Sequence, residues 1–249
     1  RINTSVVVAA DIDADGDQDL FIGAHSLPGR YPEAQKSVLL QNDGKGNFSA
    51  VRTFLHSSLV TGAVFFDVNG DKKPDLLLVG EWMKPTVYLN QNGKWNEHKE
   101  ATKSLTSQLS YALTKADLDN DGDDDFVIGN MGLNTQYHVT SGDQLKLYFN
   151  DFSGNGGMLP LVAVNENGKE YPYAGRDELL DQIPALKKKY SSYVTYATAT
   201  LSEMLGDDLL KSARQSDAQE LRTGILWNER GQFVFKPLPI DAQYAPVYG

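Results

Sequence analysis

Oxygen-bearing side chains recur at alternate positions in three short loops, which begin at Asp11, Asp67 and Asp117. In each loop an Asp or Asn stands at relative positions 1, 3, 5 and 9. Such hard ligands in a tight turn suit Ca²⁺, which takes roughly six to eight oxygens in flexible geometry, better than Mg²⁺, which requires a near-ideal octahedron. We therefore predict about three structural calcium ions, each also bound by the carbonyl oxygen at position 7. The predicted ligands are Asp11, Asp13, Asp15, Asp17, Asp19, Asp67, Asn69, Asp71, Lys73, Asp75, Asp117, Asp119, Asp121, Asp123 and Asp125.

Two other interpretations compete with a calcium site. An EF-hand requires a Glu at position 12 and a helix on each side, but position 12 is Ile or Leu in all three loops and lies inside an apolar run. An acidic turn without metal remains the alternative. The second loop is the weakest, because Lys72 stands where the other loops have glycine, and a non-glycine residue in a left-handed turn costs roughly 1–2 kcal/mol. A fourth loop, which begins at Asp151, lacks an acid at position 9, so we expect it to bind calcium weakly or not at all.

The elements that would position these loops form a repeat. The loops start at residues 11, 67 and 117, so the two intervals are 56 and 50 residues. Each loop is followed by an apolar run that ends in glycine, which is typical of a buried strand. An apolar strand ending in Asn, a glycine-containing turn and an aromatic residue make a hairpin signature, which occurs at residues 38–48, 87–95 and 225–233. The pattern predicts one four-stranded antiparallel sheet per repeat and therefore an all-β protein, a β-propeller.

We expect about four blades in one propeller segment that belongs to a longer protein. The expected boundaries are residues 1–58, 59–105, 106–150 and 151–249. The last blade should carry a helical insertion at about residues 177–214, because apolar residues there follow the helical period. Asp177 suits a helix N-terminus, and Pro184 marks a first turn or a kink. The simplest role for such an apolar stripe is to cover the edge of a sheet.

The composition narrows the possible functions. The formal net charge is −10, and the basic residues cluster only at Lys187, Lys188 and Lys189, so we expect no binding to nucleic acid. No apolar stretch approaches the roughly 20 residues that cross a bilayer, so we expect no membrane insertion. The absence of cysteine excludes disulfides and thiolate metal sites. Three calcium ions, each adding two charges, would bring the net charge from −10 to −4 and explain most of the acidity.

The residues that could support catalysis are sparse. The four histidines, at positions 25, 56, 98 and 138, form no metal-ligand pair, and we find no nucleophile arrangement. Paired carboxylates are plentiful, but a carboxylate bound to calcium stays ionised and is a poor general acid. His25, Asn130 and Asn134 follow buried strands and are weak candidates for a ligand site on the rim. These patterns favour a binding module over an enzyme.

The three loops with their apolar, glycine-ended runs resemble FG-GAP/VCBS repeats, which occur in integrin α-subunit propellers and in bacterial surface proteins. The segments 129–134, 171–180 and 183–189 are similar to the bacterial branch related to cartilage acidic protein, whose members often carry a UnbV-type domain. The resemblance implies a propeller, usually seven-bladed, with structural calcium and an extracytoplasmic location, which is secreted, periplasmic or on the outer cell surface. It implies no activity.

Two functions follow as expectations. The first is a calcium-stabilised binding or scaffold module of an extracytoplasmic bacterial protein, with a glycan or a protein as its partner. The alternative is a part of a carbohydrate-active enzyme, a lyase or a hydrolase, built on a propeller.

Overall fold

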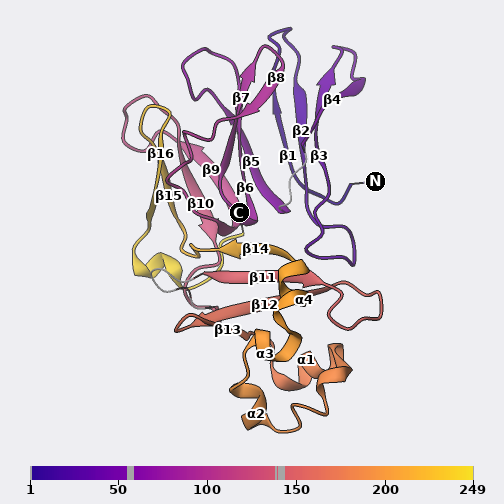
Figure 1. Ribbon diagram of the computed structural model, residues 1–249. Helices are drawn as coiled ribbons and strands as arrows, with labels where there is room; N and C mark the ends of the chain where they lie inside the picture. The colour runs from indigo at the N-terminus through magenta and orange to yellow at the C-terminus, as the bar shows by residue number, and fades with distance from the viewer. Residues whose placement is uncertain (1, 55–58, 138, 140–143, 249) are drawn as a thin grey trace. The chain divides into compact units, whose positions relative to one another are not determined.

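The computed structural model describes residues 2–54, 59–137, 139 and 144–248 (Figure 1). His56 and His138 lie outside these residues. The chain divides into two compact units. The first, which we call the three-blade unit, comprises residues Arg1–Gln136 and Glu220–Gly249, and the second, the inserted unit, comprises Tyr137–Gln219. Among the described residues, no helix combines the length and the hydropathy that a membrane-spanning segment needs.

The three-blade unit contains the predicted groups of four antiparallel strands, and the fold is propeller-like. The strands of the first group form a sheet of their own, whereas those of the second and third groups are joined in one eight-stranded sheet. The first blade has the strands β1 (Thr4–Ala10), β2 (Asp19–Ala24), β3 (Ser37–Asn42) and β4 (Phe48–Phe54), paired in that order. The second blade has β5 (Leu59–Phe66), β6 (Asp75–Met83), β7 (Thr86–Gln91) and β8 (Lys94–Glu97). Each acidic loop connects the first two strands of its blade, as the repeat predicted.

The third blade differs from the expected boundaries. Its first strands are β9 (Gln108–Ala116) and β10 (Asp125–Asn130), but β10 pairs next with β15 (Gly224–Asn228), which pairs with β16 (Phe233–Pro237). The blade is therefore completed by a hairpin almost a hundred residues further along the chain, and the inserted unit interrupts it between β10 and β15. The expected boundary at residue 150, and with it a fourth blade at 151–249, is wrong.

Alternation along the strands explains how the blades pack. Successive side chains of a strand point to opposite faces of its sheet. In β6, Leu76 and Leu78 join a buried cluster with Phe21 of the first blade, whereas Leu77 and Val79 join a second cluster with the third blade. The middle blade thus buries both faces, which is why β6 reads as a continuous apolar run. The hydrophobic core lies between neighbouring blades.

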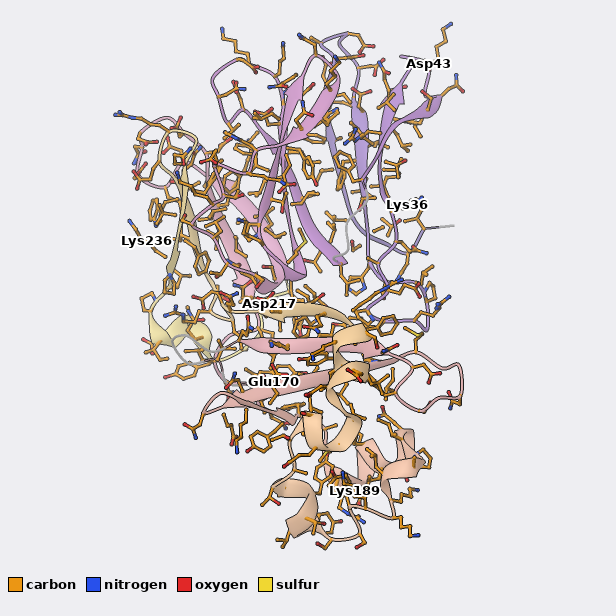
Figure 2. All side chains as sticks on the ribbon, viewed as in Figure 1. Lys36, Asp43, Glu170, Lys189, Asp217 and Lys236 are labelled. Atoms are coloured by element: carbon orange, nitrogen blue, oxygen red, sulfur yellow. The ribbon has the colours of Figure 1, made fainter. Side chains whose placement is uncertain are left out.

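The glycine that ends the apolar run of β6 is required by close packing. A Cβ atom on Gly80 would lie 2.0 Å from the carbonyl oxygen of Leu59 on β5. No side chain fits at that distance, so Gly80 allows the first two strands of the blade to approach each other at the end of the pair. The charged side chains of Asp43 and Lys236, in contrast, are exposed and point outward (Figure 2).

The inserted unit combines a second kind of four-stranded sheet with short helices. Its strands are β11 (Leu145–Asn150), β12 (Leu159–Glu166), β13 (Lys169–Pro172) and β14 (Arg214–Ala218), in the order β13-β12-β11-β14. Between β13 and β14 lie α1 (Arg176–Gln182), the 3-10 helix η1 (Pro184–Leu186), α2 (Tyr193–Ala197), α3 (Leu201–Leu205) and α4 (Asp207–Ser212). Their apolar side chains form one buried cluster with those of the sheet.

The helices are shorter than the sequence pattern indicated, because local signals divide them. Pro184 begins the 3-10 helix at its first position. Ser192 caps α2, and Thr200 forms a capping box with Glu203 at the start of α3. Gly206 ends α3 with a positive φ of 84°. The helical segment itself was predicted correctly at 177–214.

Candidate metal centres

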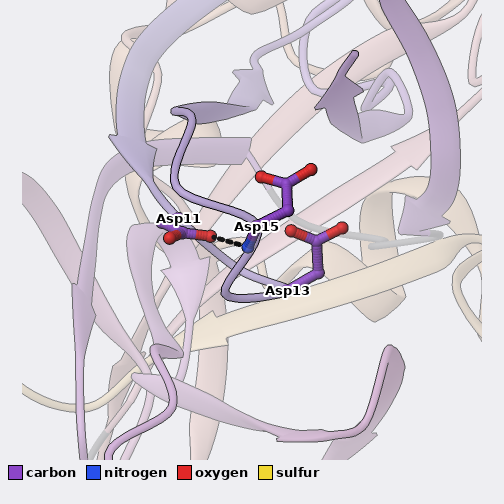
Figure 3. A group of neighbouring side chains, drawn as sticks. All are labelled: Asp11, Asp13 and Asp15. Carbon is purple, nitrogen blue, oxygen red and sulfur yellow. Dashed lines mark hydrogen bonds between the residues drawn. The ribbon is translucent and has the colours of Figure 1, made fainter. Parts of the chain in front are cut away.

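The first acidic loop brings three carboxylates together. Asp11, Asp13 and Asp15 each offer an oxygen atom, and these atoms lie within 4.8 Å of one another (Figure 3). That separation is about twice a calcium–oxygen distance of roughly 2.4 Å, so one ion could contact all three. The turn is held by Asp11, whose carboxylate accepts hydrogen bonds from the amides of Asp15, at 3.2 Å, and Gly16, at 3.0 Å.

Asp17 in the same loop has an unusual environment. Its Oδ1 atom is buried and has no hydrogen-bond partner among the described residues. Burial raises the pKa of the Asp17 carboxyl above its ordinary value, and the charges of Asp15 and Asp19 raise it further. A cation held by Asp11, Asp13 and Asp15 would compensate the neighbouring charges that add to this shift. The residues of this loop therefore fit a divalent ion that prefers oxygen.

The third loop repeats this geometry. Asp117, Asp119 and Asp121 also offer oxygens within 4.8 Å of one another. Gly122 has a φ of 96°, the value that Gly16 also has, and its amide donates to Asp117 at 3.2 Å. Burial raises the pKa of Asp119, and the charge of Asp121 adds to the shift. Two loops that lie 106 positions apart in the sequence, at residues 11 and 117, thus fold alike.

In the second loop, the carboxylate of Asp67 accepts hydrogen bonds from amides of its own loop. Asp67 accepts hydrogen bonds from the amides of Gly70, at 2.8 Å, and Lys72, at 2.6 Å. Lys72 has a positive φ of 64°, the strained conformation expected where the other loops have glycine. Among the described residues, this loop forms no close group of three carboxylates, because Asn69 stands at position 3. The Lys73 side chain donates to Asn92 at 2.6 Å.

The acids at position 9 were predicted as metal ligands, but their carboxylates accept hydrogen bonds from backbone amides instead of joining the close groups. Asp19, Asp75 and Asp125 are at most 2% exposed, and they do not belong to the close groups of three. In each, one carboxylate oxygen accepts the amide of the loop residue at position 2, at 3.0–3.1 Å. The other oxygen accepts the amide of the Asn near the end of the third strand, at 2.7–3.0 Å. Each acid therefore ties its loop to the hairpin of the same blade.

Burial changes the pKa of one of these acids. Removal from water raises the pKa of Asp75, while the hydrogen bonds from Asn90 and Val68 lower it in part. The sequence contained a signal for this role, since an Asn recurs at the hairpin of every blade, at residues 42, 90 and 228. From the sequence, these asparagines were interpreted only as part of the hairpin signature.

The loop at Asp151, between β11 and β12, is satisfied by its own backbone. Asp151 accepts hydrogen bonds from the amides of Gly156, at 2.7 Å, and Asn155, at 3.2 Å, and from the hydroxyl of Ser153, at 3.1 Å. The hydrogen bond from Gly156 is the main reason why the pKa of Asp151 lies below its ordinary value. The carboxylate is thus stabilised without an ion, and no second acid follows in the loop.

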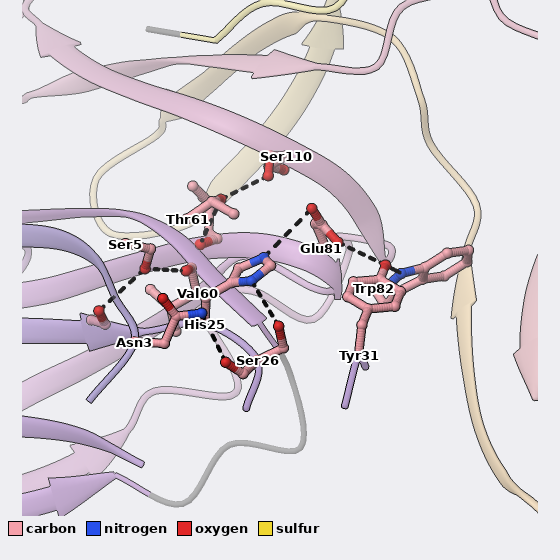
Figure 4. Close-up of polar contacts among 12 residues, drawn as sticks. Asn3, Ser5, His25, Ser26, Tyr31, Val60, Thr61, Glu81, Trp82 and Ser110 are labelled. Atoms are coloured by element: carbon pink, nitrogen blue, oxygen red, sulfur yellow. Dashed lines mark hydrogen bonds and ion pairs between the residues drawn. The ribbon is translucent and has the colours of Figure 1, made fainter. Parts of the chain in front are cut away.

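Polar contacts between blades lie at the opposite ends of the strands (Figure 4). His25 Nε2 lies 3.6 Å from Glu81 of the second blade, and Tyr31 donates to the same carboxylate at 2.8 Å. Trp82 Nε1 donates to the Tyr31 hydroxyl at 2.6 Å, and Trp82 has a positive φ of 57°. Burial, followed by the charge of Glu81, strongly raises the pKa of Tyr31. The candidate His25 therefore takes part in a contact between blades.

Two hydroxyl groups also join neighbouring blades and were missed from the sequence. Ser5 donates from β1 to the carbonyl of Val60 on β5, and Thr61 donates from β5 to the carbonyl of Ser110 on β9, the latter at 2.7 Å (Figure 4). Ser5 and Thr61 both stand six positions before the first Asp of their loop. The spacing was visible, but a hydroxyl in a strand does not by itself indicate its partner.

The two asparagines that were candidates for a rim site have structural partners. Asn130 is buried, and its amide group donates to Gln108, at 3.1 Å, and to the carbonyl of Arg222, at 2.7 Å. Asn134 donates to the carbonyl of Tyr244 at 3.1 Å. Both side chains therefore fix loops within the three-blade unit.

Comparison with known proteins agrees with the repeat geometry. A family model described as an FG-GAP-like repeat matches residues 11–78 and 67–128, which contain all three acidic loops. No curated protein matches the chain.

Proposed function

Because the chain is an FG-GAP repeat protein with a propeller-like fold, we propose that it is a calcium-stabilised binding or scaffold module that acts outside the cytoplasm of a bacterium. Its partner would be a glycan or a protein. Calcium sites of extracellular modules are weak, with dissociation constants of roughly 10⁻⁴–10⁻³ M, and need millimolar calcium. Solvent-exposed loops with few fixed ligands suit that range. Kinship with the branch that carries UnbV-type domains stays a prediction.

One observation carries the calcium proposal. The first loop gathers the carboxylates of Asp11, Asp13 and Asp15 within the span of one ion and also leaves Asp17 Oδ1 buried without a partner among the described residues. Carboxylates a few ångströms apart repel one another unless a cation lies between them. Asp117, Asp119 and Asp121 form a second group with the same geometry. The ion would hold the loop closed, and it would supply no chemistry beyond charge compensation and geometry.

We favour a binding module over a carbohydrate-active enzyme. The close carboxylates lie in loops whose proposed role is to hold an ion, and a carboxylate held that way donates no proton. His25 contacts Glu81 across two blades and is surrounded by the structural contacts of Tyr31 and Trp82. These contacts hold the first two blades together.

Thermal unfolding with and without calcium tests the proposal. At about 1 mM calcium and a dissociation constant near 0.1 mM, each occupied site adds roughly 1.4 kcal/mol to the free energy of unfolding. Weaker sites add correspondingly less. We expect a chelator to lower the melting temperature, and Asp15→Asn or Asp121→Asn to remove part of that calcium response.

The matched control is Glu229→Gln, an exposed acid in the turn between β15 and β16, which should leave the calcium response unchanged. A wild-type protein that melts at the same temperature in calcium and in excess chelator would contradict the proposal. So would a calcium response that survives both loop substitutions at full size.

A further inference from the structure

A cavity opens between the first and second blades, next to the first acidic loop. Its volume is about 480 Å³, within the roughly 300–1,000 Å³ range of small-ligand sites. The first blade contributes Gln41 from β3, Val51 from β4 and Asp13 from the loop, and the second blade contributes Lys73 and Asn92. The apolar floor includes Trp95 of β8.

The floor of the cavity is rigid. Asn90 Nδ2 donates across the two blades to the carbonyl of Ile12 at 2.7 Å, and the backbone amide of Asn90 donates to the buried Asp75 at 2.7 Å. Trp95 is 3% exposed and packs 6.3 Å from Phe65, measured between ring centroids. The cavity is thus formed by groups that are already fixed, and a ligand would lose little free energy in ordering them.

The polar groups around the cavity are mixed in sign. Asp13, which also accepts a hydrogen bond from Gln41, lies on the wall of the first blade, and Lys72 and Lys73 lie on the wall of the second. A calcium ion in the first loop would compensate Asp13, and the two lysines would then repel a cationic ligand. Hydroxyl groups both donate and accept hydrogen bonds, so they can pair with acids, amides and ammonium groups alike. Lys73 Nζ uses one donor on Asn92 at 2.6 Å and keeps two more.

From these observations we propose that the cavity binds a saccharide without cationic groups. The apolar lining, which includes Val51 at 48% exposed, would contact the C–H face of a sugar ring, and the side chains of Gln41, Lys73 and Asn92 would hold its hydroxyls. This inference rests on the proposed binding function and assigns its glycan site to the groove between the first two blades. The site lies beside the metal loop but needs no direct contact between the sugar and an ion.

Isothermal titration with defined oligosaccharides tests the site. The probes are the neutral β-1,4-linked hexamers of glucose, mannose and xylose, with an oligogalacturonate of similar length as the charged counterpart, all in the presence of calcium. We expect at least one of these oligosaccharides to bind. Gln41→Ala and Lys73→Ala should each weaken binding by about five- to tenfold, as expected for one lost hydrogen bond.

A bulky substitution blocks the cavity without touching its polar groups. Val51 is 48% exposed, and Val51→Trp should abolish binding by filling the space. Val234→Trp is the matched control, because Val234 is 39% exposed on the equivalent outer strand of the third blade. The melting temperature in calcium shows whether each variant folds, and the two alanine variants decide the question if Val51→Trp does not.

The proposal is overturned if none of these oligosaccharides binds, or if both the blocking and the alanine variants bind like the wild type. A calcium-dependent melting temperature without saccharide binding would remove this site and leave the calcium proposal intact. Loss of the calcium response with retained saccharide binding would remove the calcium proposal and leave this site intact.

Discussion

Asp19→Ala tests whether the buried acid of the first loop acts by tying the loop to its blade or by binding an ion. Asp19 accepts the amides of Ile12, at 3.0 Å, and Asn42, at 2.8 Å, and its side chain is fully buried. The substitution leaves two donors without an acceptor in a site closed to solvent. A hydrogen bond to a charged group contributes roughly 1.5–3 kcal/mol, and removing the buried charge offsets part of the loss. We therefore expect a loss of about 3 kcal/mol, both in calcium and in chelator.

Asp15→Ala is the contrasting variant. Asp15 is exposed and belongs to the close group of three carboxylates, so its removal should reduce the stability only when calcium is present. The assay is urea unfolding followed by tryptophan fluorescence. All three tryptophans, Trp82, Trp95 and Trp227, lie in the three-blade unit, so the signal reports that unit alone.

The reasoning fails in either of two cases. If Asp19→Ala is as stable as the wild type in chelator and is destabilised only in calcium, Asp19 acts as a metal ligand and the tie contributes little. If Asp15→Ala loses as much stability in chelator as Asp19→Ala does, the close group of carboxylates has a structural role without an ion.

Two further predictions concern the packing of each unit. Gly80→Ala should reduce the free energy of unfolding by about 3 kcal/mol or more, since the new Cβ would lie 2.0 Å from the Leu59 carbonyl oxygen. Gly175→Ala is the control, because no atom lies within 4 Å of its Cβ, and this variant should melt like the wild type. Burial raises the pKa of Tyr196 to about 12, and its hydroxyl donates to Ala174 at 2.6 Å. Because the folded pKa exceeds the unfolded value of roughly 10, this contribution to stability is complete below pH 10 and is lost as the pH rises toward 12. Tyr196→Phe should remove that part of the alkaline loss in a series of chemical unfolding curves, and an unchanged pH dependence would contradict the assignment.

The local part of the fold was predictable because each blade repeats its own signals. The acidic loop, the apolar run that ends in glycine and the Asn-containing hairpin each depend on residues close together in sequence. The pairing of β10 with β15 does not, since it joins Phe126 to Leu226 across the inserted unit. Consecutive strands usually pair, and that expectation placed the last hairpin in a fourth blade. One signal indicated otherwise, because no hairpin signature follows the third loop until Asn228.

The sequence indicated where acidic side chains gather but not how each of them is oriented. Alternate spacing correctly indicated that Asp11, Asp13 and Asp15 converge. The same spacing placed Asp19 among the ligands, although it begins β2 and its carboxylate accepts two amides from its own blade. Side-chain direction in a strand depends on register and neighbours, which spacing alone does not contain.

The main chain of Ile12 connects these features. Its amide donates to Asp19 within the first blade, and its carbonyl accepts from Asn90 of the second blade at 2.7 Å. Order in the first loop therefore bears directly on a contact between blades, and that contact is part of the floor of the cavity. An ion that fixes Asp11 and Asp13 on either side of Ile12 would fix both hydrogen bonds as well. Calcium in the loop and a ligand in the cavity should then stabilise each other, because each restrains the same stretch of backbone.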